Sequence, residues 1–471
     1  MWQTGEERPT AVERDALLAA GTPLALASLA QTLIGTLAVA VAGRLGDVAL
    51  GAVGLGSTLF FTVAMLGVGI LLGVDPIVTQ ALGRGDGATA RAVVARGLRL
   101  AVLLACSLGV VLLFLAQALG YAGLPTATLD GVRSYLWGRL PGLVPYLAFV
   151  VLRSALAARG QARQVLFAAL IANVGVLATA PLLARSLGVA GVGLAESAGA
   201  LLQLGASAWS GRRFLSLAAP SALGSILRSG LPVGLAMVAE YSVFAAMGLL
   251  VARLDAGALG AHQVAITWVG TLFVLPHGFG TGALARVGRA LGRGAPDAAL
   301  RSGLVALGIG VVFGVCAGLA LLSFPSELAA WVTNDPKAIA RSAPLLAVAA
   351  LALVADSAQA VLVGAVRGTG DTRGALVSCV VGHYALGLPA GVVLAVPVGL
   401  GAVGLWLGLS LGLSAVAVLL AVRFIRGVAP VQARASSCES RSPPRSLPAP
   451  WRARGCSRHP SLGPVTSRLL P

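Results

Sequence analysis

Charged residues are scarce in this sequence, and their scarcity excludes most water-soluble folds. They make up 11% of the 471 residues, against 57% hydrophobic residues, and the mean hydropathy is +0.90. Soluble domains carry about 25% charged residues, so this chain lacks the polar groups that a surface in water requires. The apolar stretches are long enough to cross a bilayer, and lipid offers no partner for exposed backbone groups. The composition therefore predicts an all-α polytopic membrane protein.

Cysteine and histidine are also rare, which argues against a metal centre. None of the five cysteines stands at the spacing of a metal-ligand set. His262, His277 and His383 are scattered through the second half of the chain, where we expect them to be hydrogen-bonded residues of helix packing. No Ser–His or His–Asp arrangement supports an intramembrane enzyme. We expect no cofactor apart from a coupling ion.

The net charge of +17 suggests a nucleic-acid partner, but the distribution of the arginines does not. They stand at the ends of apolar runs, as in the loops of membrane proteins. The segment after Gly427 alone carries seven arginines against one glutamate. Membrane lipid is therefore a partner that we expect, and nucleic acid is not. The basic tail could touch anionic lipid, but a non-functional extension is the interpretation we prefer for it.

Apolar runs between arginine-containing or Gly/Pro-containing breaks predict twelve transmembrane helices. They lie near 17–43, 50–74, 98–120, 134–157, 164–184, 188–209, 229–252, 259–284, 302–323, 343–366, 374–396 and 398–422.

Loop charges predict which side of the membrane each loop occupies. Arginines gather in alternate loops, around 84–99, 153–163, 212–228, 286–301 and 367–373, whereas the other loops hold few. The positive-inside rule places the arginine-rich loops in the cytoplasm. With an even number of helices, both termini then lie in the cytoplasm, and we expect a multi-pass protein of the cell's inner (plasma) membrane.

The second half of the sequence repeats the first. A shift of 209 residues places Gly21 and Pro23 on Gly230 and Pro232, and Ala-Leu-Gly-Arg-Gly recurs at 81–85 and 290–294. Each half holds six predicted helices, so both halves insert the same way up, as parallel repeats. The fold class predicted is therefore two six-helix lobes related by a parallel internal repeat, an architecture suited to alternating access.

The repeat also sets the expected domain boundaries. They are a cytoplasmic N-terminus (1–15), an N-lobe (16–210), a cytoplasmic inter-lobe loop (211–228), a C-lobe (229–426) and a disordered basic tail (427–471). The tail is rich in Pro, Ser and Arg and has no periodicity.

Three acidic residues stand inside predicted helices, where a charge is costly and calls for an explanation. They are Glu196, Glu240 and Asp356. Glu240 and Asp356 lie near the middle of helices seven and ten of one lobe, so together they could bind Na⁺ or exchange protons. At the repeat offset, Glu240 corresponds to Gln31, which suggests that ion coupling belongs to the C-lobe.

Further polar and aromatic residues are candidates for the wall of a substrate cavity. A negative cavity would attract lipophilic cations, and aromatic rings would bind them by cation–π contact. The candidates are Gln31, Tyr241, Phe244, Trp268, Gln263, Gln359 and Glu196. Glu196 fits a helix-packing contact equally well, since small residues surround it.

Several segments resemble the MATE (multidrug and toxic compound extrusion) transporters, nearest the NorM-like branch. The matching segments are Asp-Pro-Ile-Val-Thr-Gln-Ala-Leu-Gly-Arg-Gly (75–85), Pro-Val-Gly-Leu-Ala-Met-Val-Ala-Glu (232–240), Gly-Ala-His-Gln-Val-Ala (260–265), Arg-Val-Gly-Arg-Ala-Leu-Gly-Arg-Gly (286–294), Arg-Gly-Thr-Gly-Asp-Thr-Arg (367–373) and Gly-Leu-Pro-Ala-Gly (387–391). The resemblance covers residues 15–425.

This resemblance implies a secondary active multidrug efflux transporter, not an enzyme. It would export organic, often cationic and aromatic compounds in exchange for Na⁺ or H⁺, and would act as a monomer. The family's acidic residues of helices seven and ten fall on Glu240 and Asp356. Two positions depart from the family: Ala38 replaces a frequent helix-one aspartate, and Ala352 a NorM-like tyrosine.

A lipid-linked sugar flippase of the same superfamily is the alternative function. Such a protein would need cations along its cavity to hold pyrophosphate. Arg139, inside the fourth predicted helix, is the one arginine that stands apart from the loops in this way.

Overall fold

A computed structural model describes residues 9–122, 125–212, 223–254, 258–333 and 336–440. These residues are almost entirely helical and include no strand. Within them, twelve helical segments are long and apolar enough to cross a membrane. The predicted all-α polytopic class and the number of spans are thereby confirmed.

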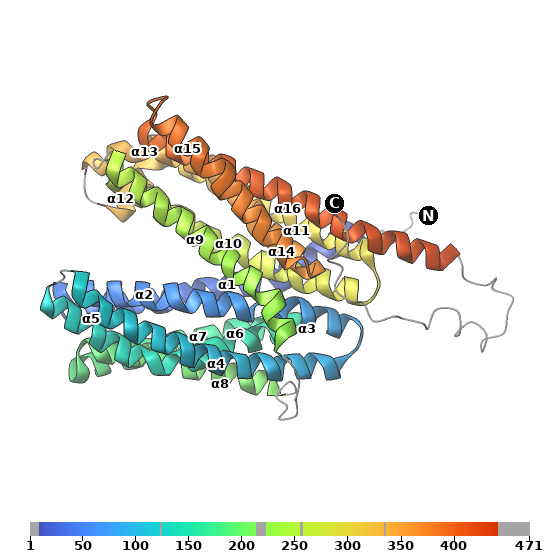
Figure 1. The fold of residues 1–471 in the computed structure, drawn as a ribbon, viewed down its shortest axis with the longest axis horizontal. Coiled ribbons are helices and arrows are strands. Elements are labelled where there is room, and N and C mark those ends of the chain that lie inside the picture. Colours follow the sequence, from blue (N-terminus) through green and yellow to red (C-terminus); the bar gives the residue numbers. More distant parts are fainter. Residues whose placement is uncertain (1–8, 123–124, 213–222, 255–257, 334–335, 441–471) are drawn as a thin grey trace, which may run out of the picture.

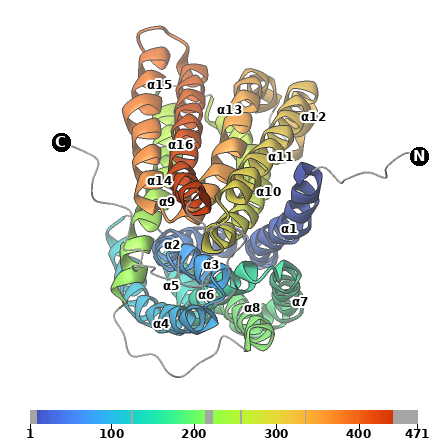
Figure 2. The ribbon, with the colours of Figure 1, turned by 90° about the vertical axis from the view of Figure 1, so that its right-hand side faces the viewer.

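The helices form two lobes (Figures 1 and 2). The N-lobe comprises α1 (Pro9–Gly43), α2 (Asp47–Leu71), α3 (Val74–Gly83), α4 (Gly87–Ala118), η1 (Leu119–Ala122), α5 (Thr126–Arg139), η2 (Leu140–Gly142), α6 (Leu143–Ala158), α7 (Ala162–Leu187) and α8 (Val189–Ser210). The C-lobe comprises α9 (Gly224–Leu254), α10 (Leu259–Gly292), α11 (Pro296–Ser323), α12 (Pro325–Val332), α13 (Pro336–Thr369), α14 (Thr372–Val380), the π-helical η5 (Val381–Gly387), α15 (Leu388–Ala395) and α16 (Gly401–Ser440).

Many helices extend beyond the predicted apolar runs at their arginine-rich ends. For example, α4 begins at Gly87 instead of near residue 98. Arginine ends an apolar run but favours helix, so a helix continues past the hydrocarbon into the headgroup region. The start of α4 is set by Asp86, whose carboxylate accepts a hydrogen bond from the Thr89 amide at 2.9 Å. Hydrogen bonds from Thr89 lower the pKa of Asp86.

The two ends of the chain are also more helical than the sequence suggests. Helix α1 begins at Pro9, inside the segment 1–15 that was expected to precede the first helix. Helix α16 continues to Ser440, so the first part of the expected tail 427–471 is helical. Ala, Gln and Arg between residues 431 and 435 are helix-favouring, which accounts for the extension. Residues 441–471 lie outside the described residues.

The lobes contact each other through pairs of helices that the internal repeat relates to one another. A Cβ added to Gly69 of α2 would overlap the Cα of Gly234 in α9, and one added to Gly278 of α10 would overlap the Cα of Ala25 in α1. A shift of 209 residues converts the first pair into the second. Such reciprocal contacts define an approximate two-fold axis between the lobes. The structure therefore confirms the parallel repeat.

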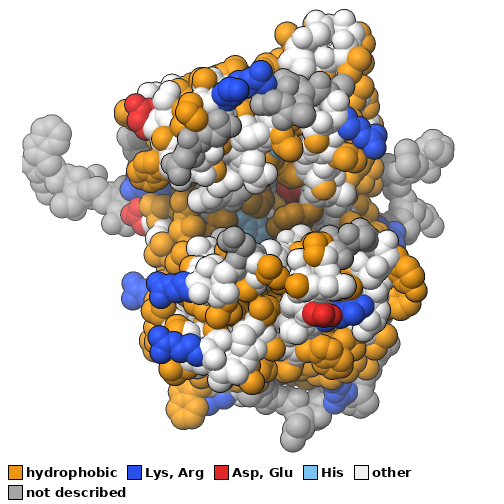
Figure 3. Space-filling view, turned by 90° about the vertical axis from the view of Figure 1, so that its left-hand side faces the viewer, with side chains coloured by type: hydrophobic (Ala, Val, Ile, Leu, Met, Phe, Trp, Pro, Cys, Tyr) orange, Lys and Arg blue, Asp and Glu red, His pale blue; other side chains and the backbone are white. Residues whose placement is uncertain are grey.

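The lobes touch at one end of the molecule and part at the other (Figure 1). At the end with the arginine-rich loops, Gly83 of α3 packs against Gly292 of α10, whose Cα would lie 2.8 Å from an added Cβ. Seen from the opposite end, the surface is hollowed between the lobes, and both acidic and histidine side chains are visible within the hollow (Figure 3). We call these the closed end and the open end.

Inside the C-lobe, α10 and α13 cross at Gly280 and Gly364, where an added Cβ on Gly364 would overlap the carbonyl oxygen of Gly280. We expect Gly364→Ala to destabilise the protein by about 1–3 kcal/mol through overpacking. Gly270→Ala on the exposed face of α10, where an added Cβ meets nothing within 4 Å, is the control. Thermal unfolding in detergent measures both, and equal melting temperatures would contradict the close crossing.

Candidate functional site

Glu240 lies on α9 where the two lobes begin to separate. Toward the closed end, α9 packs against the N-lobe, and Met237 still contacts the N-lobe core. One helical turn later, Glu240 is half-buried. Glu240 therefore follows directly on the part of α9 that packs against the N-lobe.

Asp356 and Gln359 approach Glu240 from α13. The Gln359 amide Nε2 donates a hydrogen bond to Glu240 Oε1 at 2.7 Å. Asp356 is 2% exposed, and Glu240 is near enough for the two carboxylates to repel each other when both are ionised. Three of the predicted site residues, carried by α9 and α13, are therefore neighbours.

Two oxygen atoms at this place have no hydrogen-bond partner among the described residues. They are Asp356 Oδ1 and Gln359 Oε1, and both are buried. A buried acceptor without a partner is costly. Together with the Glu240 carboxylate they form an oxygen-rich set, which suits a small hard cation; a proton on Asp356 would equally reduce the repulsion.

Tyr384 hydrogen-bonds to α9 next to Glu240 and is not among the residues predicted from the sequence. It lies on η5, and its hydroxyl donates to the Ala239 carbonyl at 2.9 Å and shares a 2.6 Å hydrogen bond with Ser242. Single π-helical turns inside helices are frequent at functional sites. A tyrosine within a predicted membrane helix was the available signal, but nothing in the sequence places it next to residue 239.

The aromatic candidates lie at different distances from the carboxylates. Tyr241 is 57% exposed and Phe244 packs half-buried against the C-lobe core. Trp268 donates from Nε1 to the Leu328 carbonyl of α12 at 3.0 Å. Its ring lies 6.2 Å from that of Trp331 on the same short helix. Trp268 therefore belongs to the rim of the open end.

The three glutamine candidates also lie in different parts of the structure. Gln31 of α1 accepts a hydrogen bond from Gln203 of α8 at 2.7 Å, inside the N-lobe. Gln263 of α10 is exposed. Of the three glutamines considered, Gln359 alone is hydrogen-bonded to Glu240.

Glu196 belongs to a buried N-lobe network and is 1% exposed. The Tyr135 hydroxyl donates to its Oε2 at 2.5 Å, and Arg139 Nε lies 3.6 Å from the same oxygen. The Arg139 guanidinium also stacks over the Phe60 ring, 4.1 Å from its centroid. This network joins α2, α5 and α8, which is the helix-packing role considered for Glu196, and it buries Arg139 away from the hollow.

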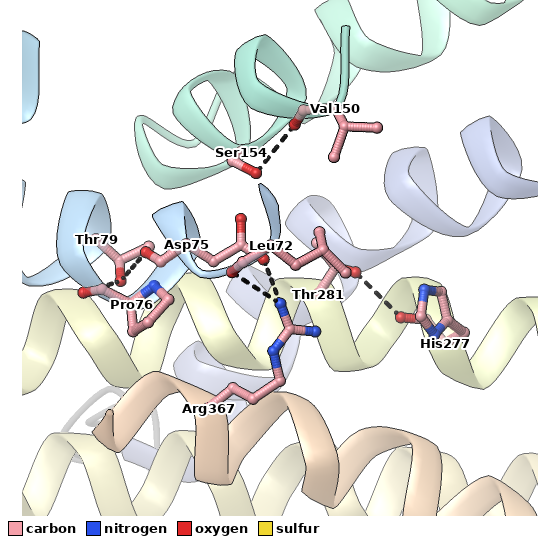
Figure 4. A network of polar contacts seen from close by, with 9 residues as sticks. All are labelled: Leu72, Asp75, Pro76, Thr79, Val150, Ser154, His277, Thr281 and Arg367. Carbon is pink, nitrogen blue, oxygen red and sulfur yellow. Dashed lines mark hydrogen bonds and ion pairs between the residues drawn. The ribbon is translucent and has the colours of Figure 1, made fainter. Parts of the chain in front are cut away.

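Two ion pairs join the lobes at the closed end. Arg367 of α13 contacts Asp75 of α3 at 2.6 Å (Figure 4). Arg286 of α10 forms two hydrogen bonds of 2.7 Å with Glu13 of α1, whose carboxylate also accepts one from Ser302. Asp75 and Arg367 both lie in segments matched by family motifs, but the sequence does not show that they meet.

The MatE family model matches residues 23–182 and again residues 232–393, which is more than half of the chain. The chain belongs to the MatE family. The two matches begin 209 residues apart, at the offset of the internal repeat. The family membership thus agrees with the two-lobed fold.

Relatives of this MatE chain span nearly its whole length. It is 33% identical over 448 residues to a probable multidrug resistance protein NorM of Brucella suis, covering 88% of this chain and 94% of the relative. It is 35% identical over 437 residues to a similarly named protein of Deinococcus radiodurans, covering 88% and 96%.

Solved structures share the fold at lower identity. The eukaryotic MATE transporter AtDTX14 matches with a TM-score of 0.80 and 18% identity, covering 90% of this chain and 99% of that one. The Vibrio cholerae MATE transporter VcmN in its bent form matches with a TM-score of 0.82 and 17% identity, covering 90% and 99%.

The buried network predicts that Glu196 stabilises the N-lobe. Glu196→Leu leaves the Arg139 charge buried without its partner, which should cost about 3–5 kcal/mol. Tyr135→Phe removes one hydrogen bond to a charged group and should cost about 1.5–3 kcal/mol. Thermal unfolding in detergent measures both variants. An unchanged melting temperature for Glu196→Leu would exclude the structural role.

Proposed function

We propose that this MatE chain is a secondary active multidrug efflux transporter that exchanges organic compounds for Na⁺ or H⁺. The relatives named as multidrug resistance proteins support the substrate class. The observation that carries the exchange mechanism is the half-buried Glu240, hydrogen-bonded to Gln359 beside the buried Asp356. A negative site in a hollow suits organic cations, with Tyr241 as an exposed aromatic contact.

The chemistry of the site explains why the two ligands would exclude each other. With both carboxylates ionised, their mutual repulsion favours any bound positive charge. A bound Na⁺ or proton removes that repulsion and with it the attraction for an organic cation. Binding of the coupling ion on one side would therefore release the substrate there, as antiport requires.

We infer from the charges that the closed end faces the cytoplasm of an inner-membrane protein. The arginine-rich loops and the start of α1 lie at this end, in keeping with the positive-inside rule. The hollow then opens to the outside, so the structure represents an outward-facing state. Each lobe is one rigid unit of the rocking motion, and a single chain contains the whole site.

The flippase alternative finds little support in the hollow. Arg139, the cation that would have signalled a pyrophosphate site, is 3% exposed and pairs with Glu196 inside the N-lobe. The acids Glu240 and Asp356 give the C-lobe site the opposite sign.

The proposed exchange is tested by removing each carboxylate separately. We expect Glu240→Gln and Asp356→Asn to slow ethidium efflux from cells by about tenfold or more, which corresponds to an activation barrier about 1.4 kcal/mol higher. Efflux is driven in turn by a sodium gradient and by a pH gradient, which also identifies the coupling ion.

Asp130→Asn is the matched control, since this carboxylate is 74% exposed on α5 at the open end. It should transport at the rate of the unmodified protein. Full transport by Glu240→Gln or Asp356→Asn under both gradients would exclude that residue as a coupling site.

A further inference from the structure

We propose that Asp75 and Arg367 form a clasp that holds the closed end shut, and that α13 links this clasp to the Glu240–Asp356 site. The first part rests on geometry alone, whereas the second rests on the proposed function. Asp75 belongs to the N-lobe and Arg367 to the C-lobe, so the clasp must break whenever the lobes part at this end.

The clasp is buried and makes several contacts. Arg367 Nη2 lies 2.6 Å from Asp75 Oδ2 and also donates to the Leu72 carbonyl at 3.2 Å (Figure 4). The side chains of Asp75 and Arg367 are only 6% and 8% exposed. Beside them, Gln80 Nε2 donates to the Gly368 carbonyl at 3.1 Å. These bonds all join α3 or the residues before it to the end of α13.

The local fold presents Leu72 and Asp75 to Arg367. Helix α2 ends at Leu71 and α3 begins at Val74, and at this break the Leu72 carbonyl accepts hydrogen bonds from both the Asp75 amide and Arg367, each at 3.2 Å. Gly73 lets α9 pack closely here, because an added Cβ would lie 2.6 Å from the Gly230 Cα. The break therefore serves the inter-lobe contact.

Removing the charge of one partner would raise the free energy of the state in which this end is closed. A buried charge that has lost its partner is far more costly than a buried neutral pair. Arg153 of α6 is also near enough to repel Arg367. In a state where this end is open, water would solvate Arg367, so loss of Asp75 should shift the equilibrium toward that state.

Helix α13 carries both the clasp and the coupling site. Asp356 and Arg367 are about three helical turns apart, which places them on the same face. The proline inside α13, Pro344, precedes both, so nothing in the described helix breaks it between them. A displacement of α13 on ion binding at Asp356 would therefore reach Arg367.

The experiment measures the distance between spin labels at the open end, at Ala127→Cys on α5 and Ala330→Cys on α12, both exposed. The native cysteines Cys106, Cys316, Cys379, Cys438 and Cys456 are first replaced by serine. Double electron–electron resonance on the full chain in nanodiscs needs no substrate or gradient, so its result is independent of transport.

We expect Asp75→Asn to lower the ratio of long to short label distances by about tenfold or more, within the usual range of conformational coupling. Combining it with Arg367→Gln should return the ratio to within about threefold of the unmodified protein, because no charge then remains buried without a partner. Gln80→Leu, which removes an inter-lobe hydrogen bond without stranding a charge, is the control and should change the ratio less than about threefold.

An unchanged ratio in Asp75→Asn, or no recovery in the double variant, would overturn the clasp. The link through α13 is tested by Asp356→Asn, which should shift the ratio at least about threefold more in the intact clasp than in the double variant. Equal shifts would overturn the link while leaving the clasp intact, and neither result depends on whether ethidium is transported.

Discussion

A charge buried away from water needs a partner, and this constraint accounts for the pairing of buried acids in this protein. Glu196 pairs with Arg139, Asp75 with Arg367 and Glu13 with Arg286. Among the described residues, neither Glu240 nor Asp356 has an arginine or lysine within ion-pair distance. Three acids are thus neutralised by the protein itself. The remaining two have no such cationic partner, which is the feature on which the proposed coupling site rests.

The internal repeat gives the two lobes the same arrangement of helices, but equivalent positions carry different side chains. At the position where α9 carries Glu240, bonded to Gln359, α1 carries Gln31, bonded to Gln203. The N-lobe pair is neutral on both sides, and Ala38 stands where many family members have an aspartate. At this pair of equivalent positions the carboxylate is therefore in the C-lobe alone, in keeping with the proposed ion coupling there.

Glu240 and Asp356 could be picked out from the sequence because a carboxylate inside a predicted membrane helix is rare, and the structure shows that they are neighbours. Trp268 and Glu196 show the limit of that logic. Both satisfy the rule that polar or aromatic residues in a span are candidates, yet Trp268 is tied to α12 at the rim and Glu196 to Tyr135 in the N-lobe. Many predicted spans are also shorter than the helices that contain them, because arginine interrupts hydrophobicity without interrupting a helix.

The sequence alone determined the helical class, the number of spans and the parallel repeat, and it placed Glu240 and Asp356 inside predicted helices, because each depends on composition, period or position along one chain. Only the tertiary structure decided which residues meet across the lobes. Asp75 and Arg367 lie in separate motifs, and Tyr384 becomes a neighbour of Glu240 only through the packing of η5 on α9. Such contacts depend on the angle at which helices cross. Close approaches between helices, such as that of Gly69 to Gly234, set this angle, and no single segment encodes it.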